Sequence, residues 1–544
     1  MTVDTARQSI DAALRNPVLI EAALALSEDR LHDAEPLLRG RLRDAPTDVA
    51  AIRMMAELAA RIGRLKDSEA LLRRALELAP SFGVARANLA TVLYKQNRFP
   101  EALEQLDAVL AEEGDNPAQQ NLKAAALGRI GGYEEAIGLY KDLIERFPDH
   151  AKLWMSYGHM LKTVGEQDSS VAAYRRALDV EPTLGEVWWS LANLKTVRFS
   201  DEDITAMQTA LATVGLTDED KFHLHFALGK ASEDRALHED AFAHYAAGNA
   251  LRSAELQHDP DNVKAQVDHV IRTVTPDFLA AREGAGDSAA DPIFIIGMPR
   301  AGSTLIEQIL SSHSQIEGTM ELPDIPAMAM REAREHEGSK AKEDASSWLV
   351  AVADMTAERL SVLGAEYIER TRIQRKTSKP FFIDKLPNNW AYLGFIRLIL
   401  PNAKIIDARR HPLDCCFSNF RQHFAKGQSF SYDLAHMGRY YADYVRAMTH
   451  FDTVLPGYVH RVIHEWMLED HESEIHRLLA FLDVPFEEAC LNFHANTRAV
   501  RTASSEQVRR PINRDGVDQW KPYEHHLDAL KTALGSYWMT YPEL

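Results

Sequence analysis

Prolines recur at a fixed distance in the first half of this 544-residue chain. Pro46 and Pro80 are 34 residues apart, and Pro148 and Pro182 are again 34 apart, with twice that distance between the two pairs. A period of this length indicates supersecondary units that bury their apolar faces against one another. Small residues also recur 12 positions apart, as in Ala22 and Ala34, Ala90 and Ala102, and Ala124 and Ala136. The pattern predicts six or seven helical hairpins from residue 15 to about residue 255.

These hairpins resemble tetratricopeptide repeats, whose period is 34 residues. The resemblance implies an all-α superhelix over residues 1–255, with a concave face that suits an extended peptide. A protein or peptide partner is therefore expected to bind through the repeat array. Residues 196–217 fit the period poorly, and we interpret them as a degenerate repeat or a connector. Residues 256–290 are predicted to form a connecting helix and a linker, because the segment ends in a run of glycine, acidic and serine residues.

The second half opens with a strand, a glycine loop and a helix in that order. Ile293–Ile296 is a short apolar run that suits a buried parallel strand, and a helical apolar pattern begins at Leu305. Loop amides and the first free N–H groups of such a helix converge on a phosphate or sulfate. A nucleotide P-loop would carry lysine where Ser303 stands, whereas the cation here is Arg300. Because a guanidinium holds an oxyanion without metal, the loop favours metal-free anion transfer over ATP or GTP hydrolysis.

The loop residues resemble the 5′-phosphosulfate loop of sulfotransferases, most closely the tyrosylprotein sulfotransferase type. The resemblance covers residues 291–544 and implies a P-loop-like α/β domain with a central parallel sheet. The whole chain would then combine an all-α array with an α/β domain. The resemblance also implies 3′-phosphoadenosine 5′-phosphosulfate as co-substrate, no metal, and a donor-binding loop made of Arg300, Ala301, Gly302, Ser303 and Thr304. The alternative is a glycine turn that merely joins a strand to a helix.

Two residues are implied as catalytic by the resemblance, Glu321 and Lys385. Glu321 follows Arg300 by 21 residues, where the family has the base that accepts the proton of the acceptor hydroxyl. A phenol with a pKa of about 10 is a poor nucleophile without such a base. A carboxylate with an ordinary pKa of about 4.3 must therefore act in concert with attack or be desolvated. Asp324 is the second candidate for the base, and an exposed loop acid is the alternative for Glu321.

Lys385 follows the predicted strand 381–383 and matches the family's lysine at the oxygen between sulfate and phosphate. Its ammonium would stabilise charge that develops on the leaving phosphate. The alternative is a surface ion pair with Asp384.

A second phosphate signature follows the predicted strand 404–408. Arg410 and Ser418 are eight residues apart, and Pro412 suits the first turn of the intervening helix. The resemblance implies that this pair holds the 3′-phosphate of the donor, with Arg409 as an alternative to Arg410. Further along, His464 stands where the family commonly has tyrosine on the adenine side.

Near the end of the chain, the resemblance implies that Ser504 matches a serine that grips the phosphosulfate. In the family a basic residue near a tryptophan flanks the nucleotide, and Lys521 is the candidate here, although it follows Trp520 where the animal enzymes have lysine before the tryptophan. A polar loop is the alternative for this stretch. Cys415 and Cys416 are interpreted as packed thiols, with a catalytic cysteine as the alternative.

Composition limits the remaining function classes. The formal net charge of −19 disfavours a general nucleic-acid binder. The three cysteines include no C-x-x-C pair, which favours a reducing compartment. The N-terminus lacks a secretory pattern, and no apolar run reaches the ~18 residues of a membrane span. We therefore expect a soluble, cytoplasmic protein without a membrane span, unlike the Golgi-anchored animal tyrosylprotein sulfotransferases.

Together these patterns predict a sulfotransferase that moves a sulfuryl group to an acceptor hydroxyl by in-line displacement. A tyrosine of a protein or peptide is the first candidate acceptor, and a saccharide or a small phenol is the alternative. A magnesium-dependent P-loop kinase or nucleotidyl enzyme and a non-catalytic repeat scaffold are the rivals from other classes. The sequence does not indicate an oligomeric state.

Overall fold

The computed structural model describes residues 15–337, 348–424, 427–500, 502 and 507–543. The chain divides into two compact units, residues 1–161 and residues 162–544. The second unit contains the last repeats as well as the sheet.

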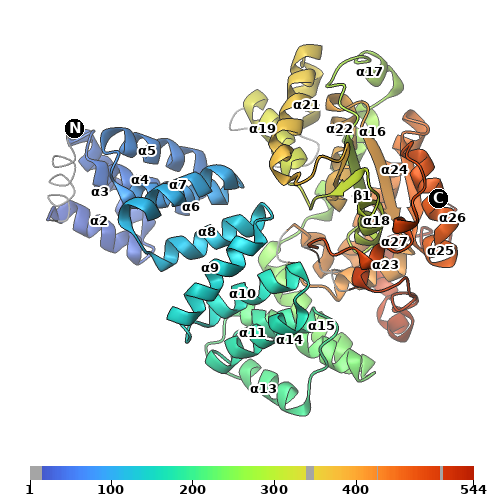
Figure 1. Cartoon of the computed structure of the whole chain (residues 1–544), viewed down its shortest axis with the longest axis horizontal. Coiled ribbons are helices and arrows are strands. Elements are labelled where there is room, and N and C mark those ends of the chain that lie inside the picture. The colour runs from blue at the N-terminus through green and yellow to red at the C-terminus, as the bar shows by residue number, and fades with distance from the viewer. Residues whose placement is uncertain (1–14, 338–347, 425–426, 501, 503–506, 544) are drawn as a thin grey trace. The chain divides into compact units, whose positions relative to one another are not determined.

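The first unit consists of helices that pair in sequence (Figure 1). Its described helices are α2 (Pro17–Ser27), α3 (Leu31–Asp44), α4 (Val49–Arg61), α5 (Leu65–Leu78), α6 (Gly83–Lys95), α7 (Phe99–Glu113), α8 (Pro117–Arg129), α9 (Tyr133–Arg146) and the first part of α10 (Ala151–Val164). All six alanines that define the 12-residue spacing are fully buried. The predicted helical hairpins are therefore confirmed, because these small side chains let the paired helices approach closely.

The second unit begins with the end of α10 and five further repeat helices: α11 (Gln167–Val180), α12 (Gly185–Ala192), α13 (Asp201–Leu211), α14 (Asp218–Asp234) and α15 (His238–Leu256). Residues 196–217, which fit the period poorly, contain α13, and this helix packs against α14. The helix before them, α12, has only 8 residues, whereas α4, α6 and α8 have 13 each. The repeat is thus shortened at the point where its period breaks.

Two helices follow the repeats, α16 (Pro260–Thr273) and α17 (Pro276–Ala280). α16 packs along α24 (Leu434–Val454), where Asp268 pairs with Arg446. The helical part of the predicted connecting segment therefore lies against the sheet domain. The boundaries at residues 255 and 290 remain predictions.

The sheet has five described strands, all paired in parallel: β1 (Pro292–Gly297), β2 (Ile316–Gly318), β3 (Phe381–Asp384), β4 (Lys404–Arg409) and β5 (Val459–Ile463). Their order is β2-β3-β1-β4-β5, so β1 is central, and every residue of β1 is buried. The predicted central parallel sheet is confirmed. The three-residue strand β2 was not predicted, because its apolar signal is a single isoleucine.

Helices surround the sheet (Figure 1). They are α18 (Ser303–Ser311), α19 (Asp324–Glu337), α20 (Trp348–Ala353), α21 (Ala357–Thr371), α22 (Leu393–Ile399), α23 (Pro412–Phe420), α24, α25 (His464–Glu469), α26 (His471–Phe481) and α27 (Asp528–Leu534). Those from α18 to α24 connect the strands of the sheet, whereas α25, α26 and α27 follow the last strand. α18 follows β1 and α23 follows β4, and these two strands are neighbours. Since parallel strands end at one edge of the sheet, the two predicted phosphate loops lie next to each other.

Gly297 ends β1 at a very close approach to β4. Its φ is +133°, and a Cβ at this position would lie 2.4 Å from the carbonyl oxygen of Ala408. Both the backbone conformation and the contact therefore exclude a side chain. This glycine sets the separation of the strands from which both loops depart.

We predict that Gly297→Ala lowers the free energy of unfolding by about 3 kcal/mol or more, because β1 and β4 must separate. Gly457→Ala is the matched control, since Gly457 also has a positive φ, of +77°, but no atom lies within 4 Å of its would-be Cβ. The control should lose about 1–2 kcal/mol through backbone strain alone. Urea denaturation followed by tryptophan fluorescence measures both losses, and equal losses would contradict the close-approach argument.

Candidate active site

The loop between β1 and α18 is held in a conformation suited to an anion. Arg300 has a φ of +66° and Gly302 a φ of +99°, so the chain turns sharply just before the helix begins at Ser303. The first N–H groups of α18 lack acceptors within the helix and point out of its N-terminus. A Cβ on Gly302 would lie 2.8 Å from Nδ1 of His464, which explains the need for glycine there.

The two predicted phosphate signatures are joined by hydrogen bonds. Nε of Arg300 donates to Oγ of Ser418 at 3.1 Å, and Nη1 of Arg410 donates to the carbonyl oxygen of Arg300 at 3.2 Å. Asn419 of α23 also donates to the carbonyl oxygen of Pro299 at 2.7 Å. The structure therefore brings Arg300, Arg410 and Ser418 together at one edge of the sheet.

Positive charge is concentrated where the loops meet. Burial, together with the nearby Arg410 and Arg421, lowers the pKa of Arg300 to about 10. Burial and the same cluster of cations lower the pKa of His464 to about 3, so this imidazole is neutral at pH 7. Nε of Arg410 is buried and has no hydrogen-bond partner among the described residues. The repulsion between the arginine side chains and the unpaired Nε of Arg410 both fit a site that binds a multiply charged anion.

The two predicted catalytic residues form an ion pair. Nζ of Lys385 donates to Oε1 of Glu321 at 2.6 Å, and the lysine side chain is 1% exposed, whereas that of Glu321 is 46% exposed. Lys385 therefore does not pair with Asp384, whose carboxylate accepts a hydrogen bond from Tyr367. Asp324, the second candidate base, pairs with Arg370 at 2.9 Å.

A buried carboxylate lies on the other side of Lys385. Glu307 of α18 is 2% exposed and lies 4.0 Å from Nζ of Lys385 and 3.0 Å from Nη2 of Arg498. Arg498 also donates to Gln308, the next residue of α18. The lysine thus lies between a buried acid and a half-exposed one, which keeps its charge compensated inside the fold.

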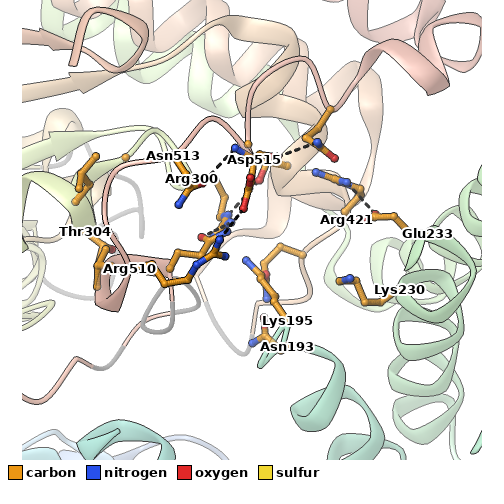
Figure 2. Close-up of a pocket in the computed structure, with 18 of the residues that line it drawn as sticks. Asn193, Lys195, Lys230, Glu233, Arg300, Thr304, Arg421, Arg510, Asn513 and Asp515 are labelled. Atoms are coloured by element: carbon orange, nitrogen blue, oxygen red, sulfur yellow. Dashed lines mark hydrogen bonds and ion pairs between the residues drawn. The ribbon is translucent and has the colours of Figure 1, made fainter. Parts of the chain in front are cut away.

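A cavity of about 680 Å³ opens beside the phosphate loops (Figure 2). Six residues of the predicted site line it: Arg300, Gly302, Ser303, Thr304, Arg410 and Ser418. Its volume lies within the range of small-molecule and cofactor sites. Glu321, Lys385 and the buried Ala301 are not among its lining residues. The cavity therefore lies beside the two phosphate loops, next to Arg410 and Ser418, and the pair of Glu321 and Lys385 lies outside its lining.

Lys521, a predicted donor contact, does not line this cavity. Its side chain is exposed and pairs with Asp518 at 2.7 Å. Ser504 lies outside the described residues. Arg409, the alternative to Arg410, is buried against Asp407 at 2.9 Å and does not line the cavity.

Neither the cysteines nor a metal cluster contributes to the cavity. Burial raises the pKa of Cys415 to about 12 and that of Cys416 well above its ordinary value, which argues against a thiolate nucleophile. Within the described ranges, one group of side chains has the arrangement for a metal ion, formed by Glu239, His525 and His526. These residues do not line the cavity.

Sequence reasoning missed several residues of the site. Glu307 and Arg498 carried no motif, although a charge next to the apolar positions of α18 was a usable signal. His464 was noted only as a departure from a family pattern. Lys195 lines the cavity from the repeat side, and its only signal was the break in the repeat period.

The fold and the loops define an α/β domain with an anion site, preceded by helical repeats. Residues 292–488 match the family model described as the sulfotransferase family, and residues 63–126 and 121–183 match two tetratricopeptide repeat models. The chain therefore carries tetratricopeptide repeats followed by a sulfotransferase-family domain.

Curated relatives and a solved structure resemble the chain at low identity. An uncharacterized protein of Aquifex aeolicus (strain VF5) is 30% identical over 425 residues, covering 77% of this chain and 55% of that protein. This chain thus spans about half the length of that relative. The protein-tyrosine sulfotransferase A of Caenorhabditis elegans is 22% identical over 262 residues, covering 44% of this chain and 64% of that protein. The sulfotransferase domain of the Synechococcus PCC 7002 olefin synthase has a TM-score of 0.33 and 22% identity, covering 44% of this chain and 90% of that domain.

None of the described helices combines the length and the apolar character needed to span a bilayer.

We predict that Glu307→Gln lowers the free energy of unfolding by about 3 kcal/mol, because it removes a buried charge from between Lys385 and Arg498. Glu321→Gln removes the other acid from the same lysine, yet it should cost under about 1 kcal/mol, since that carboxylate is half-exposed. Urea denaturation of the two variants measures the difference. Equal costs would show that burial does not distinguish the two carboxylates.

Proposed function

We propose that the protein transfers a sulfuryl group from 3′-phosphoadenosine 5′-phosphosulfate to an acceptor hydroxyl. One observation carries the proposal: Arg300 and Arg410 come from the ends of two adjacent parallel strands and line one cavity with Ser418. Two neighbouring anion subsites match a donor that carries one phosphate on the 3′ position and a phosphosulfate on the 5′ position of its ribose. The buried, unpaired Nε of Arg410 supports the same assignment.

The loop residues Gly302, Ser303 and Thr304 are proposed to bind the 5′-phosphosulfate through main-chain amides and hydroxyl groups. Arg300 adds a guanidinium at the same loop, while Arg410 and Ser418 bind the 3′-phosphate. Ser504, which the structure does not describe, stays a predicted donor contact. Lys521 is not retained in the proposed donor site, because it pairs with Asp518 away from the cavity.

The proposed reaction is an in-line displacement at sulfur. The acceptor oxygen forms a bond to sulfur while the bond between sulfur and the bridging oxygen breaks. Glu321 accepts the proton of the acceptor hydroxyl, and adenosine 3′,5′-bisphosphate leaves. Lys385 stabilises the charge on the oxygen that leaves, which requires it to turn from Glu321 to the donor. Separation of this pair also frees the Glu321 carboxylate to act as a base.

A tyrosine of a protein or peptide is the proposed acceptor. Tetratricopeptide repeats suit peptide binding, and a distant relative is named a protein-tyrosine sulfotransferase. A saccharide or a small phenol remains the second candidate acceptor. The reaction is proposed to need no metal and to take place in the cytoplasm.

Glu321→Gln should reduce sulfuryl transfer by about 100- to 10,000-fold, because the amide cannot accept the proton. Transfer of radiolabel from ³⁵S-labelled donor to tyrosine peptides, saccharides and phenols in parallel measures this loss and identifies the acceptor class. Glu369→Gln is the control, since Glu369 is an exposed acid of α21 paired with Arg372. Full activity of Glu321→Gln would exclude Glu321 as the base.

Arg410→Ala should weaken binding of adenosine 3′,5′-bisphosphate by about 10- to 100-fold, because a charge-assisted contact to phosphate is lost. Isothermal titration calorimetry measures the affinity, with ATP and magnesium as a comparison. Arg439→Ala, which removes an exposed arginine paired with Asp261, is the control. If ATP binds more tightly than the bisphosphate, the kinase class is favoured and the sulfotransferase proposal fails.

A further inference from the structure

Part of the cavity wall comes from the tetratricopeptide repeats. Asn193, Lys195, Lys230 and Glu233 lie on or next to repeat helices and line the same cavity as Arg300 (Figure 2). These repeat residues belong to the same compact unit as the sheet. Repeat residues can therefore contact a ligand bound in the cavity.

The repeat helices α14 and α15 are fixed against α23, the helix that carries Ser418. Nδ2 of Asn249, a buried residue of α15, donates to the carbonyl oxygen of Phe420 at 2.9 Å. Arg421, which follows α23, pairs with Glu233 of α14 at 2.8 Å. The repeat side of the cavity is thus held next to the proposed 3′-phosphate subsite.

Most cations on this wall are neutralised by acids. Arg198 and Lys230 both pair with Asp234, and Arg421 pairs with Glu233. Lys195 differs, because its main-chain N–H donates to the carbonyl oxygen of Ala192 but its side-chain ammonium makes no hydrogen bond or ion pair with any residue that the structure describes. The side chain is therefore available to a ligand.

Local structure directs Lys195 into the cavity. α12 ends at Ala192 after 8 residues, and Lys195 follows with a φ of +63°, a left-handed conformation that side chains other than glycine rarely adopt. A full-length repeat helix would have continued through this position. Figure 2 shows the side chain reaching from the repeat helices toward the part of the cavity that contains Arg300.

The surroundings of Lys195 favour an anion. Burial lowers the pKa of Lys195 well below its ordinary value, and repulsion by Arg300, Arg421, Lys162 and Lys230 acts in the same direction. A bound phosphate would offset this repulsion and restore the ammonium.

We propose that Lys195 binds the 3′-phosphate of the donor nucleotide, so that the last tetratricopeptide repeats complete the nucleotide site. This inference rests on the proposed function. The side chain of Lys195 reaches toward Arg300, whose Nε donates to Ser418 of the proposed 3′-phosphate subsite, and Arg421, which follows α23, also acts on Lys195. These contacts favour the 3′-phosphate over the 5′-phosphosulfate. Lys195 is a binding residue in this proposal and takes no part in proton transfer.

Calorimetry with two nucleotides tests the proposal on the full chain. Lys195→Gln should weaken binding of adenosine 3′,5′-bisphosphate by about 10- to 100-fold, while the affinity for adenosine 5′-phosphate, which lacks the 3′-phosphate, should not change. Lys195→Arg keeps the cation and should bind the bisphosphate nearly as well as the wild type. Lys221→Gln is the matched control, because Lys221 lies on α14, pairs with Asp218 and does not line the cavity.

The possible outcomes separate this inference from the proposed function. If the wild type binds the bisphosphate and Lys195→Gln binds it equally well, the inference is wrong and the proposed function stands. An equal loss for both nucleotides would also overturn the 3′-phosphate assignment. If the wild type binds neither nucleotide, the proposed function itself fails. The thermal midpoint of ligand-free Lys195→Gln should equal or exceed that of the wild type, since a repelled cation has been removed, and a large decrease would identify Lys195 as a structural residue instead.

Discussion

The close approach of β1 and β4 at their carboxyl ends is the constraint on which the site depends. Gly297 allows the strands to pair up to Ala408, so that the loops carrying Arg300 and Arg410 leave the sheet side by side. Two guanidinium groups this close repel each other, and the fold offsets the repulsion with carbonyl acceptors. Arg410 donates to the carbonyl oxygens of Arg300 and Gly516, and its Nη2 lies 4.0 Å from the carboxylate of Asp414. Its buried Nε has no hydrogen-bond partner among the described residues, so this part of the guanidinium is available for a ligand.

The site contains two different electrostatic environments. Around Lys385, two carboxylates compensate the cation, and one of them is fully buried. Around Arg300 the neighbouring charges that act on its pKa are mainly cations, and the pKa is lowered. The first environment preserves a charged lysine whose partner can change during a reaction. The second environment, with its cluster of cations, is stabilised most when a multivalent anion binds. This division matches the separate tasks of stabilising a leaving group and binding a nucleotide.

Local patterns in the sequence predicted the elements that build the site. The apolar run 293–296, the glycine loop and the strands before Lys385 and Arg410 all follow from short-range rules, and the structure forms them where expected. The positions of the helical hairpins followed from the proline period and the alanine spacing.

Contacts between distant segments could not be predicted in this way. Glu307 and Arg498 meet only after the fold is complete, and although the apolar pattern of α18 marks Glu307 as a charge beside buried positions, nothing local identifies its partner. Lys521 matched a family position loosely, but its nearest acid, Asp518, is three residues away and pairs with it at the surface. β2 is too short to carry a periodic signal. The contact between Glu307 and Arg498 is created by tertiary structure, whereas the pair of Lys521 and Asp518 is local and depends on the exposure of both side chains, which the sequence alone does not reveal.

The break in the repeat period is the sequence feature most directly linked to the proposed nucleotide site. A tetratricopeptide hairpin is stabilised by a full first helix, and ending α12 after 8 residues gives up intrahelical hydrogen bonds and packing. The adjoining hairpin compensates, because α12 packs on α14 and Gly185 lets the backbone of Asp220 approach closely. The chain thereby gains a segment that is free to turn Asn193 and Lys195 into the cavity. Irregularity at this point is expected if the last repeats serve the sulfotransferase-family domain, whereas the first helices α4, α6 and α8 of earlier hairpins each keep 13 residues.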